Sequence, residues 1–418
     1  MTLRPAVSLI AAICLILTVS TGSAANNLIE NGGFELPVVP DESHETYFAP
    51  SAFPGWNVEF GGVDLTDTNF FSSAGGKQSV DLNALDSGGI YQDVVPTPGE
   101  PYRLRFQFGA NTVRIGNPET MPLVKVMEVL WGTNSLATLS LDVTGLSPTD
   151  AGWQEYSYIV TGSGSDRVTF RSLSGGHAGP AVDEVSLASL IHTVTNLADS
   201  GPGTLRQAIA DALPGDVIDF GVTGTITLTS GELVVTNDLS LIGPGATNLT
   251  VSGNNSHSVF VISSGIVELS GMTIANGMTA GTGAGINNSG TLTLSSCVVC
   301  SNSSPWKYHG GGGIANSGSM TIRSCRISNN YAEGSGGGVL GLYGSLFIHD
   351  STINNNCSPN GGGIRGGWGS TEIVNTTISG NSAGWGGGVI SGENKILRHC
   401  TITQNAAWWS YGAAIVVD

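Results

Sequence analysis

Charged residues are scarce in this sequence, because Asp, Glu, Lys and Arg make up only 11 % of its 418 residues. Basic residues are the scarcer kind, with 15 against 32 acidic ones, and the net charge of −17 argues against nucleic acid or an anionic membrane as a partner. After residue 25 no apolar run approaches the roughly 20 residues that a transmembrane helix needs. We therefore expect no nucleic-acid partner and no membrane insertion of the mature chain.

The one long apolar segment lies at the N-terminus and has the three parts of a signal peptide. Arg4 supplies a positive charge, Ala6–Val19 form an apolar stretch, and small residues follow at Gly22–Ala25. The sequence therefore predicts a signal peptide over residues 1–25 and a protein that is secreted, extracellular or held at the cell surface.

Cysteine is absent from the first half of the predicted mature chain, and the second half has five. An odd number leaves at least one thiol without an intramolecular partner. Cys297 and Cys325 occupy the same position in a repeat, so they should lie on neighbouring strands. Directly paired strand positions suit a disulfide poorly, which favours a stack of small buried side chains over a bridge. Cys297 and Cys300 have no second pair at the spacing of a zinc site.

Glycine is abundant, with 61 residues, and from about residue 270 it recurs in a fixed pattern. Each period contains a β-branched residue followed three places later by a polar turn residue, and a glycine run closed by Ile or Val. We call these β-branched residues the β-branched marks of the repeat. They follow one another at nearly equal steps, at Ile274, Val299, Ile327, Ile353, Ile378 and Ile402. A fixed period of about 25 residues with short Val, Ile and Thr runs is typical of a β-solenoid.

These marks predict a right-handed parallel β-helix over residues 193–418, of the pectate-lyase-like kind, in which each coil lies on the previous one. Residues 204–212 form a short amphipathic segment that ends before Pro214, and we expect it to be a helix that caps the first coil. Asn at the repeated turn is expected to form a ladder of side chains. The sequence stops at Asp418 within a coil, so we expect it to be a fragment.

The stretch TVTNLADSGPGTLRQAIADALPGDVIDF, residues 193–220, resembles the opening of bacterial β-helix surface proteins that carry polymorphic-outer-membrane-protein-type repeats. The glycine-Ile and polar-Asn marks are similar too. This resemblance implies a surface or secreted protein, in some cases an adhesin, and it specifies the fold better than an activity.

Residues 26–188 contain short alternating strands and turn signals, which predict an antiparallel β-sandwich of the jelly-roll type, joined to the β-helix by a linker at 189–192. Segments such as NLIENGGFELP (27–37) and GPAVDEVSL (179–187) resemble galactose-binding-like jelly rolls of the choice-of-anchor C and domain-of-unknown-function 642 types. That resemblance implies affinity for polysaccharide. It also implies a structural Ca²⁺ at Glu35 and Asp183, the only cofactor expected; the alternative is that both carboxylates accept hydrogen bonds from backbone amides.

The β-helix segment offers few groups for catalysis. Only eight of the acidic residues lie between 229 and 418, and no two of them are adjacent or separated by one residue. Glycoside hydrolysis needs two carboxylates beside one bond, so we expect a non-catalytic protein. A polysaccharide lyase or hydrolase with dispersed residues is the alternative, and Arg323, Arg365 or Arg398 beside a Glu would indicate it. A structural passenger without a ligand is the third possibility.

Aromatic residues in the glycine-rich loops are the main candidates for ligand binding. Trp306, Trp385 and Trp409 each follow a β-branched mark by the same interval, and Tyr308 and Trp408 flank them. Rings in a row beside Asn, Ser and Thr suit stacking on sugar rings. The alternative is that these side chains fold over the coil edge and seal it. The sequence thus predicts a carbohydrate-binding or adhesive protein whose partner is a cell-wall or extracellular polysaccharide.

Overall fold

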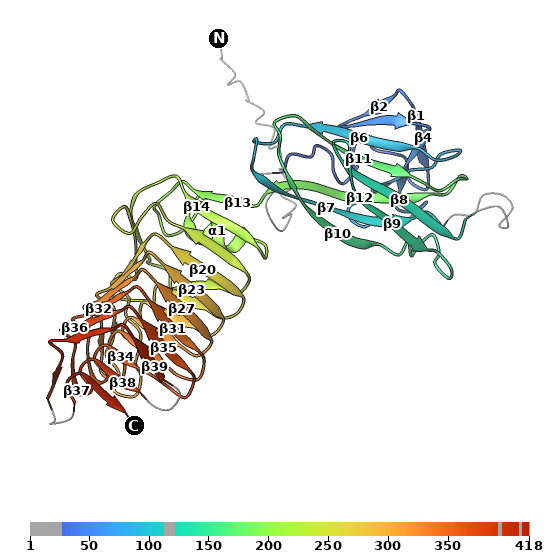
Figure 1. The fold of residues 1–418 in the computed structure, drawn as a ribbon. Coiled ribbons are helices and arrows are strands. Elements are labelled where there is room, and N and C mark those ends of the chain that lie inside the picture. Colours follow the sequence, from blue (N-terminus) through green and yellow to red (C-terminus); the bar gives the residue numbers. More distant parts are fainter. Residues whose placement is uncertain (1–26, 113–121, 392–394, 409–411, 418) are drawn as a thin grey trace, which may run out of the picture. The chain divides into compact units, whose positions relative to one another are not determined.

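The structure, a computed structural model, describes residues 27–112, 122–391, 395–408 and 412–417. The predicted signal peptide lies outside the described residues. The chain divides into two compact units, Met1–Ser189 and Leu190–Asp418. Figure 1 shows the two folds and labels many of their strands.

The first unit is an antiparallel β-sandwich of two six-stranded sheets. One sheet has the order β1 (His44–Phe48), β4 (Gly62–Asp67), β5 (Gln78–Asp81), β12 (Pro180–Ser189), β7 (Pro101–Ala110), β10 (Gln154–Thr161). The other has the order β2 (Ala52–Phe53), β3 (Trp56–Phe60), β6 (Gly89–Val94), β11 (Asp166–Ser172), β8 (Val124–Trp131), β9 (Asn134–Asp142).

Alternate residues of both sheets fill one core. Along β7 the pattern of burial alternates, and Leu104, Phe106 and Phe108 point inward. The ring of Phe106 meets that of Phe170 from the opposite sheet edge-to-face, with 5.0 Å between centroids. The predicted sandwich is therefore confirmed.

The second unit is a parallel β-helix whose coils stack along four sheets. The first sheet contains β13 (Ile191–Val194), β14 (Asp216–Phe220), β17 (Leu239–Ile242), β20 (Ile266–Ser270), β23 (Thr291–Ser295), β27 (Ser319–Arg323), β31 (Leu346–His349), β35 (Thr371–Val374) and β39 (Lys395–Arg398). The second contains β15 (Gly224–Thr227), β18 (Leu249–Ser252), β21 (Thr273–Ala275), β24 (Val298–Cys300), β28 (Arg326–Ser328), β32 (Thr352–Asn354), β36 (Thr377–Ser379) and β40 (Thr401–Thr403).

The remaining two sheets complete each coil. The third sheet contains β16 (Leu233–Val235), β19 (Phe260–Ile262), β22 (Ile286–Asn288), β26 (Ile314–Asn316), β30 (Val339–Gly341), β34 (Ile364–Arg365), β38 (Val389–Ser391) and β42 (Ile415–Val417). The fourth contains β25 (Ser303–Ser304), β29 (Tyr331–Ala332), β33 (Cys357–Asn360), β37 (Ser382–Trp385) and β41 (Ala406–Ala407).

The β-branched marks of the repeat form one column inside the β-helix. Ile327 pairs with Ile353, and Ile353 with Ile378, in parallel register, and all three are fully buried. The same column continues to Val299 in one direction and to Ile402 in the other. The predicted in-register stacking is therefore confirmed, and with it the fold class.

Asparagine side chains form a second column at the turn after the second sheet. Each side-chain amide nitrogen donates to the amide oxygen of the next Asn at 2.9–3.0 Å, in the series Asn302, Asn330, Asn356, Asn381, Asn405. The same nitrogen also donates to a backbone carbonyl of the previous coil, as Asn356 does to Ile327 at 2.9 Å. The ladder satisfies buried polar groups that a turn without strand pairing would leave unpaired.

Helix α1 (Leu205–Asp211) covers the first coil, within the segment predicted to be helical. Thr204 is its N-cap, and its side chain accepts a hydrogen bond from the backbone of Gln207. Leu205 is fully buried against the β-helix core. Within the described part of the chain, no helix is long and apolar enough to cross a membrane.

Candidate functional site

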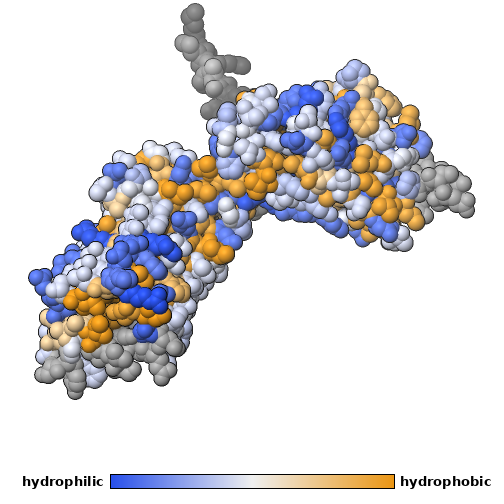
Figure 2. All heavy atoms as spheres, in the orientation of Figure 1, coloured by the Kyte–Doolittle hydropathy of each residue, from blue (hydrophilic) through white to orange (hydrophobic). Residues whose placement is uncertain are grey.

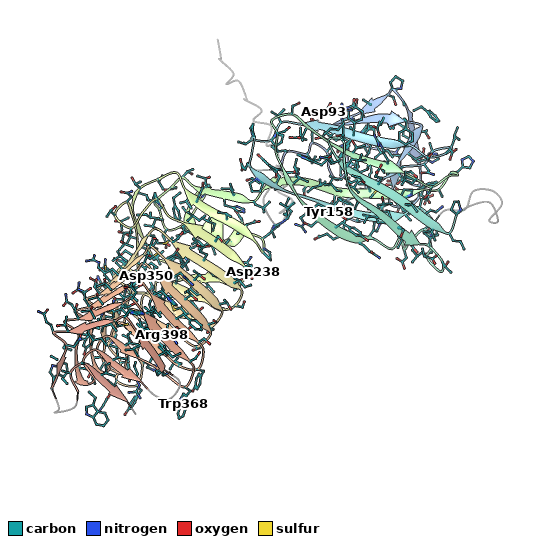
Figure 3. The ribbon with its side chains drawn as sticks, viewed as in Figure 1. Asp93, Tyr158, Asp238, Asp350, Trp368 and Arg398 are labelled. Atoms are coloured by element: carbon teal, nitrogen blue, oxygen red, sulfur yellow. The ribbon has the colours of Figure 1, made fainter. Side chains whose placement is uncertain are left out.

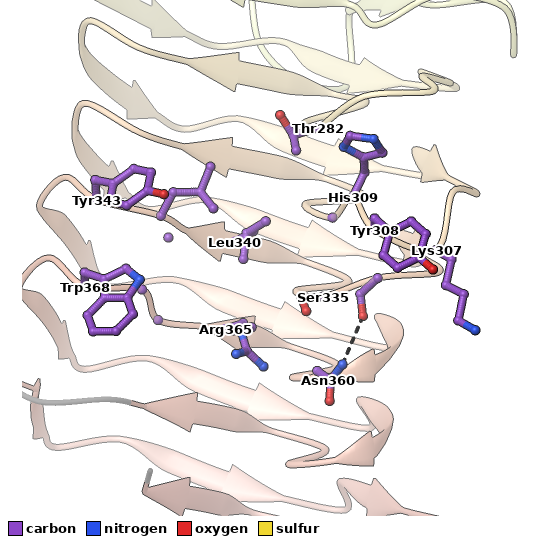
Figure 4. A pocket seen from close by; sticks show the side chains of 16 residues that line it. Thr282, Lys307, Tyr308, His309, Ser335, Leu340, Tyr343, Asn360, Arg365 and Trp368 are labelled. Atoms are coloured by element: carbon purple, nitrogen blue, oxygen red, sulfur yellow. Dashed lines mark hydrogen bonds between the residues drawn. The ribbon is translucent and has the colours of Figure 1, made fainter.

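A groove of about 750 Å³ lies on the outer surface of the third sheet of the β-helix. Strands and loops of several successive coils contribute to it, as Figure 4 shows. Its lining consists of Thr282, Lys307, Tyr308, His309, Gly310, Gly334, Ser335, Leu340, Gly341, Leu342, Tyr343, Asn360, Arg365, Gly366, Gly367 and Trp368.

The floor of the groove comes from strands β30 and β34. Val339 and Ile364 point into the core, so Leu340 and Arg365, which follow them, face outward. Leu340 and Arg365 are partners in register on neighbouring coils. The floor therefore places an apolar side chain beside Arg365, which is half-buried as a residue.

Two aromatic side chains form one wall. Tyr343 is 72 % exposed and Trp368 is 87 % exposed, and Figures 3 and 4 show Trp368 projecting from the edge of the coils. They occupy the same turn of consecutive coils, because each precedes a glycine of a stacked pair, Gly344 and Gly369. A Cβ on Gly369 would come within 1.9 Å of the carbonyl oxygen of Gly344, so this close stacking requires glycine.

The opposite wall is the loop between β25 and β26, which carries Lys307, Tyr308 and His309. The step from Val299 to Ile327 is the longest in the repeat, and those that follow it are shorter. The additional residues of this period lie in the loop. The backbone amide of His309 donates a hydrogen bond to the carbonyl oxygen of Trp306 at 3.1 Å and closes the loop. Tyr308 is 90 % exposed. The longest period thus builds the second wall.

The predicted aromatic residues have different positions relative to this groove. Tyr308 lines it, whereas Trp306, Trp385 and Trp408 are exposed but lie outside its lining. Trp409 lies outside the described residues.

The predicted common phase of Trp306 and Trp385 is wrong. Trp385 pairs in register with Asn360, Asn360 with Ser335, and Ser335 with Gly310. The column of residues that contains Trp385 therefore reaches Gly310 and not Trp306. The additional residues of the loop follow Trp306 and displace it from that column.

Tyr343 and Trp368 are groove residues that the sequence analysis missed. Relative to the β-branched residues of the repeat, Trp368 is out of phase with Trp306, Trp385 and Trp409. Measured from the following glycine, Tyr343 and Trp368 are one full period apart. That glycine was the signal that could have found them.

Glu35 and Asp183 lie in the sandwich and hold the same loop. Asp183 accepts hydrogen bonds from the backbone amides of Ala74 (2.8 Å), Gly75 (3.0 Å) and Glu184 (2.7 Å). Glu35 accepts two more from Lys77 (2.6 Å) and Gln78 (3.1 Å). Burial raises the pKa of Asp183 to about 8 despite these bonds.

Donors surround both carboxylates, which suits a hydrogen-bonded brace better than a cation site. In the described ranges, no three His, Cys, Asp or Glu residues are grouped as metal ligands. We therefore derive no function from calcium.

A second cavity, of about 220 Å³, lies beside the sandwich sheet that contains β1 and β4. Asp64 accepts a 2.6 Å hydrogen bond from Thr46 there, and burial raises its pKa. His177 Nδ1 lies 3.2 Å from the carbonyl oxygen of Ala84, and the ring of His44 packs on Phe70 with centroids 5.0 Å apart. Because these polar groups already have partners, we assign this cavity no ligand.

The enzymatic alternative requires a Glu beside Arg323, Arg365 or Arg398, and Arg398 has a Glu nearby. Glu372 and Arg398 approach to 4.0 Å on the first sheet of the β-helix, where the arginine side chain is largely exposed. Neither residue lines the groove. A weak surface pair of this kind does not provide the two carboxylates that glycoside hydrolysis requires.

The stacked cysteines are thiols. Cys297 and Cys325 are buried on neighbouring coils, and the backbone amide of Cys297 lies 3.4 Å from Sγ of Cys325. Burial raises their pKa values to about 12 and about 11, so neither is a reactive thiolate. The predicted stack of small buried side chains is confirmed.

No family model matches the chain. Similar solved structures include a family 35 carbohydrate-binding module from Clostridium thermocellum, at 17 % identity over 35 % of this chain and 97 % of that one, with a TM-score of 0.24. TmCBM61 in complex with β-1,4-galactotriose is 19 % identical over 40 % of this chain and 99 % of that one, with a TM-score of 0.26. The Agl-KA catalytic domain is 16 % identical over 90 % and 76 % of the two chains, with a TM-score of 0.31. Values this low carry no argument about function.

Proposed function

We propose that this chain is a secreted or cell-surface protein that binds polysaccharide without cleaving it, and that the groove is its glycan site. The observation that carries the proposal is the pair of aromatic walls: Tyr343 and Trp368 on one side and Tyr308 on the other, all more than two-thirds exposed. Core packing does not account for rings this exposed, whereas sugar rings bind to such faces.

The predicted signal peptide and the resemblance to repeat-bearing surface proteins support the proposed location. The polar rim of the groove, with Thr282, Ser335 and Asn360, supports a hydroxyl-rich ligand, because these side chains can both donate and accept hydrogen bonds. Figure 2 shows hydrophobic and hydrophilic residues mixed on the visible face of the β-helix unit.

The test is binding of the purified chain to a panel of immobilised polysaccharides, repeated with Trp368→Ala and Trp408→Ala. Trp408 is also exposed but does not line the groove. We expect loss of binding for Trp368→Ala and unchanged binding for Trp408→Ala. The reverse pattern would place the site at the aromatic edge predicted from the sequence, and no binding to any polysaccharide would support a structural role without a ligand.

A depolymerisation assay on the same panel tests the enzymatic alternative. Release of reducing ends or of unsaturated products would contradict the proposal of a non-catalytic protein. Glu372→Gln would then show whether the pair with Arg398 is responsible.

For Glu35 and Asp183, the hydrogen bonds to backbone amides support a structural role that needs no metal. Addition of EDTA to the purified chain should leave its melting temperature unchanged. A lower melting temperature that returns with added Ca²⁺ would instead support the calcium site.

A further inference from the structure

We infer that the groove selects polysaccharides that carry anionic groups, either carboxylate or sulfate. This inference rests on the proposed function and narrows it to one class of ligand. It is carried by the guanidinium of Arg365 on the floor, together with the charges of the side chains that line the walls.

Arg365 is held with its donors available. Its strand position fixes it facing outward, and it is half-buried beside Leu340. In the described structure, no carboxylate lies within 4.0 Å of its guanidinium and its side chain makes no hydrogen bond. Other arginines of the chain contrast with it, because they pair with carboxylates at 2.6–2.7 Å: Arg105 with Glu155, Arg167 with Asp93, Arg171 with Glu59, and Arg206 with Asp199.

A guanidinium in this setting favours a planar anion. Its five N–H donors match the geometry of a carboxylate or sulfate, and partial burial reduces the competition from water. A neutral sugar would leave several of these donors without a strong acceptor. Arg365 therefore provides a reason for the groove to discriminate by charge.

The walls of the groove carry positive charge, as Arg365 on its floor does. Lys307 adds a second cation to the lining, and of the described residues that line the groove none is Asp or Glu. Glu333 is the nearest acid along the sequence, next to Gly334, and its carboxylate accepts a hydrogen bond from the hydroxyl of Tyr331. Glu393, one period after Trp368, lies outside the described residues.

This local charge is opposite to that of the chain as a whole. The net charge of −17 arises mainly from residues 1–228, because residues 229–418 contain eight acidic and six basic residues, so the groove is a local cationic site in a nearly neutral part of the chain. The groove combines that site with exposed rings on both sides. Figure 4 shows Arg365 between Trp368 and Tyr308. A sugar ring stacked on either aromatic ring could therefore place an attached anionic group over Arg365.

The test compares matched pairs of polysaccharides that differ in charge. Alginate is compared with its propylene glycol ester, which removes the carboxylate charge, and dextran sulfate is compared with dextran. We expect the intact chain to bind at least one charged member about 10-fold or more tightly than its neutral counterpart, because hydrogen bonds to a charged acceptor are stronger than those to a neutral one. Added salt should weaken this binding. Preference for alginate would identify carboxylate, and preference for dextran sulfate would identify sulfate.

Two variants separate this inference from the proposed function. Arg365→Gln should reduce affinity for the preferred polyanion about 10-fold and reduce affinity for its neutral counterpart by much less, so that the preference for the charged member is lost. Trp368→Ala should weaken both. Arg326→Gln is the control, because Arg326 is exposed on the second sheet and does not line the groove.

Equal binding of the charged and neutral members would overturn the inference and leave the proposed function standing. Equal losses for Arg365→Gln and Arg326→Gln would also overturn it, because they would show diffuse charge attraction. Absence of binding to every polysaccharide would overturn both.

Discussion

Asn356 shows at the scale of one residue how the β-helix satisfies its turns. Its amide donates to Asn381 and to the backbone of Ile327, and it accepts both the backbone and the side-chain N–H of Asn330. Every polar atom of this fully buried side chain therefore has a partner.

We expect Asn356→Ala to lower the free energy of unfolding by roughly 2–4 kcal/mol, because it leaves buried donors of Asn330 without an acceptor. The measurement is urea denaturation followed by circular dichroism. Asn287→Ala is a matched control, since Asn287 is a half-buried, outward-facing residue of β22. Equal losses for both variants would show that the ladder has no special role.

Two buried carboxyl groups of the sandwich predict a dependence of stability on pH. Burial raises the pKa of Asp81 and of Asp183 to about 8, while the unfolded value is near 3.9. Between these values the folded state keeps protons that the unfolded state has released, so stability is greatest at low pH and is lost as pH rises through about 4 to 8.

The expected result is a melting temperature of the sandwich that falls between pH 5 and pH 8. Asp81→Asn should make this pH dependence shallower, because the amide cannot ionise. A melting temperature that rises over the same range would show that both groups are ionised in the folded state.

At the scale of elements, Asp199 connects helix α1 to the first complete coil. Its carboxylate accepts two hydrogen bonds from Arg206 on the helix and four from Thr229 and Ser230 in a turn of the coil. Burial by itself would raise the pKa of Asp199, but the bonds from Ser230, Arg206 and Thr229 together hold it well below the usual range.

We therefore expect Asp199→Asn to loosen the cap and to lower the melting temperature of the β-helix. Glu232→Gln is the control, because this exposed acid is in the same turn and offers only its backbone carbonyl to Arg206. Faster hydrogen exchange at α1 and β14 in the Asp199 variant would locate the effect. Unchanged exchange there would contradict this role.

The repeat marks explain how far elements could be predicted. Ile327, Ile353 and Ile378 recur at nearly constant spacing, and parallel stacking converts constant spacing into direct pairing, so the coils followed from the sequence. The groove did not follow, because its walls come from different phases of the repeat. Trp368 lies beside a glycine turn, while Tyr308 lies in a loop whose longer period breaks the register.

At the scale of the whole molecule, the two units have separate hydrophobic cores. One core is formed by residues between Ile29 and Leu187 and the other by residues from Val194 onward. Strand β12 ends at Ser189 and β13 begins at Ile191, so the division falls between two strands.

We expect residues 26–189 and 190–418, expressed separately, each to unfold cooperatively. Circular dichroism and calorimetry of the two pieces measure this, with the full chain as the reference. Loss of cooperative unfolding in either piece would show that its own core does not suffice. The Asp81 and Asp199 variants should then alter only the piece that contains them.

The sequence by itself determined the two folds, the stacking of the coils, the asparagine ladder and the buried cysteines. All of these depend on periodic spacing, which chain geometry translates directly into contacts between neighbouring strands. Tertiary structure alone decided which exposed rings share a groove and that Arg365 faces them with no carboxylate partner among the described residues. The groove residues occupy different positions of the repeat on different coils. Their separation along the sequence follows no regular spacing, so it does not predict their distance in space.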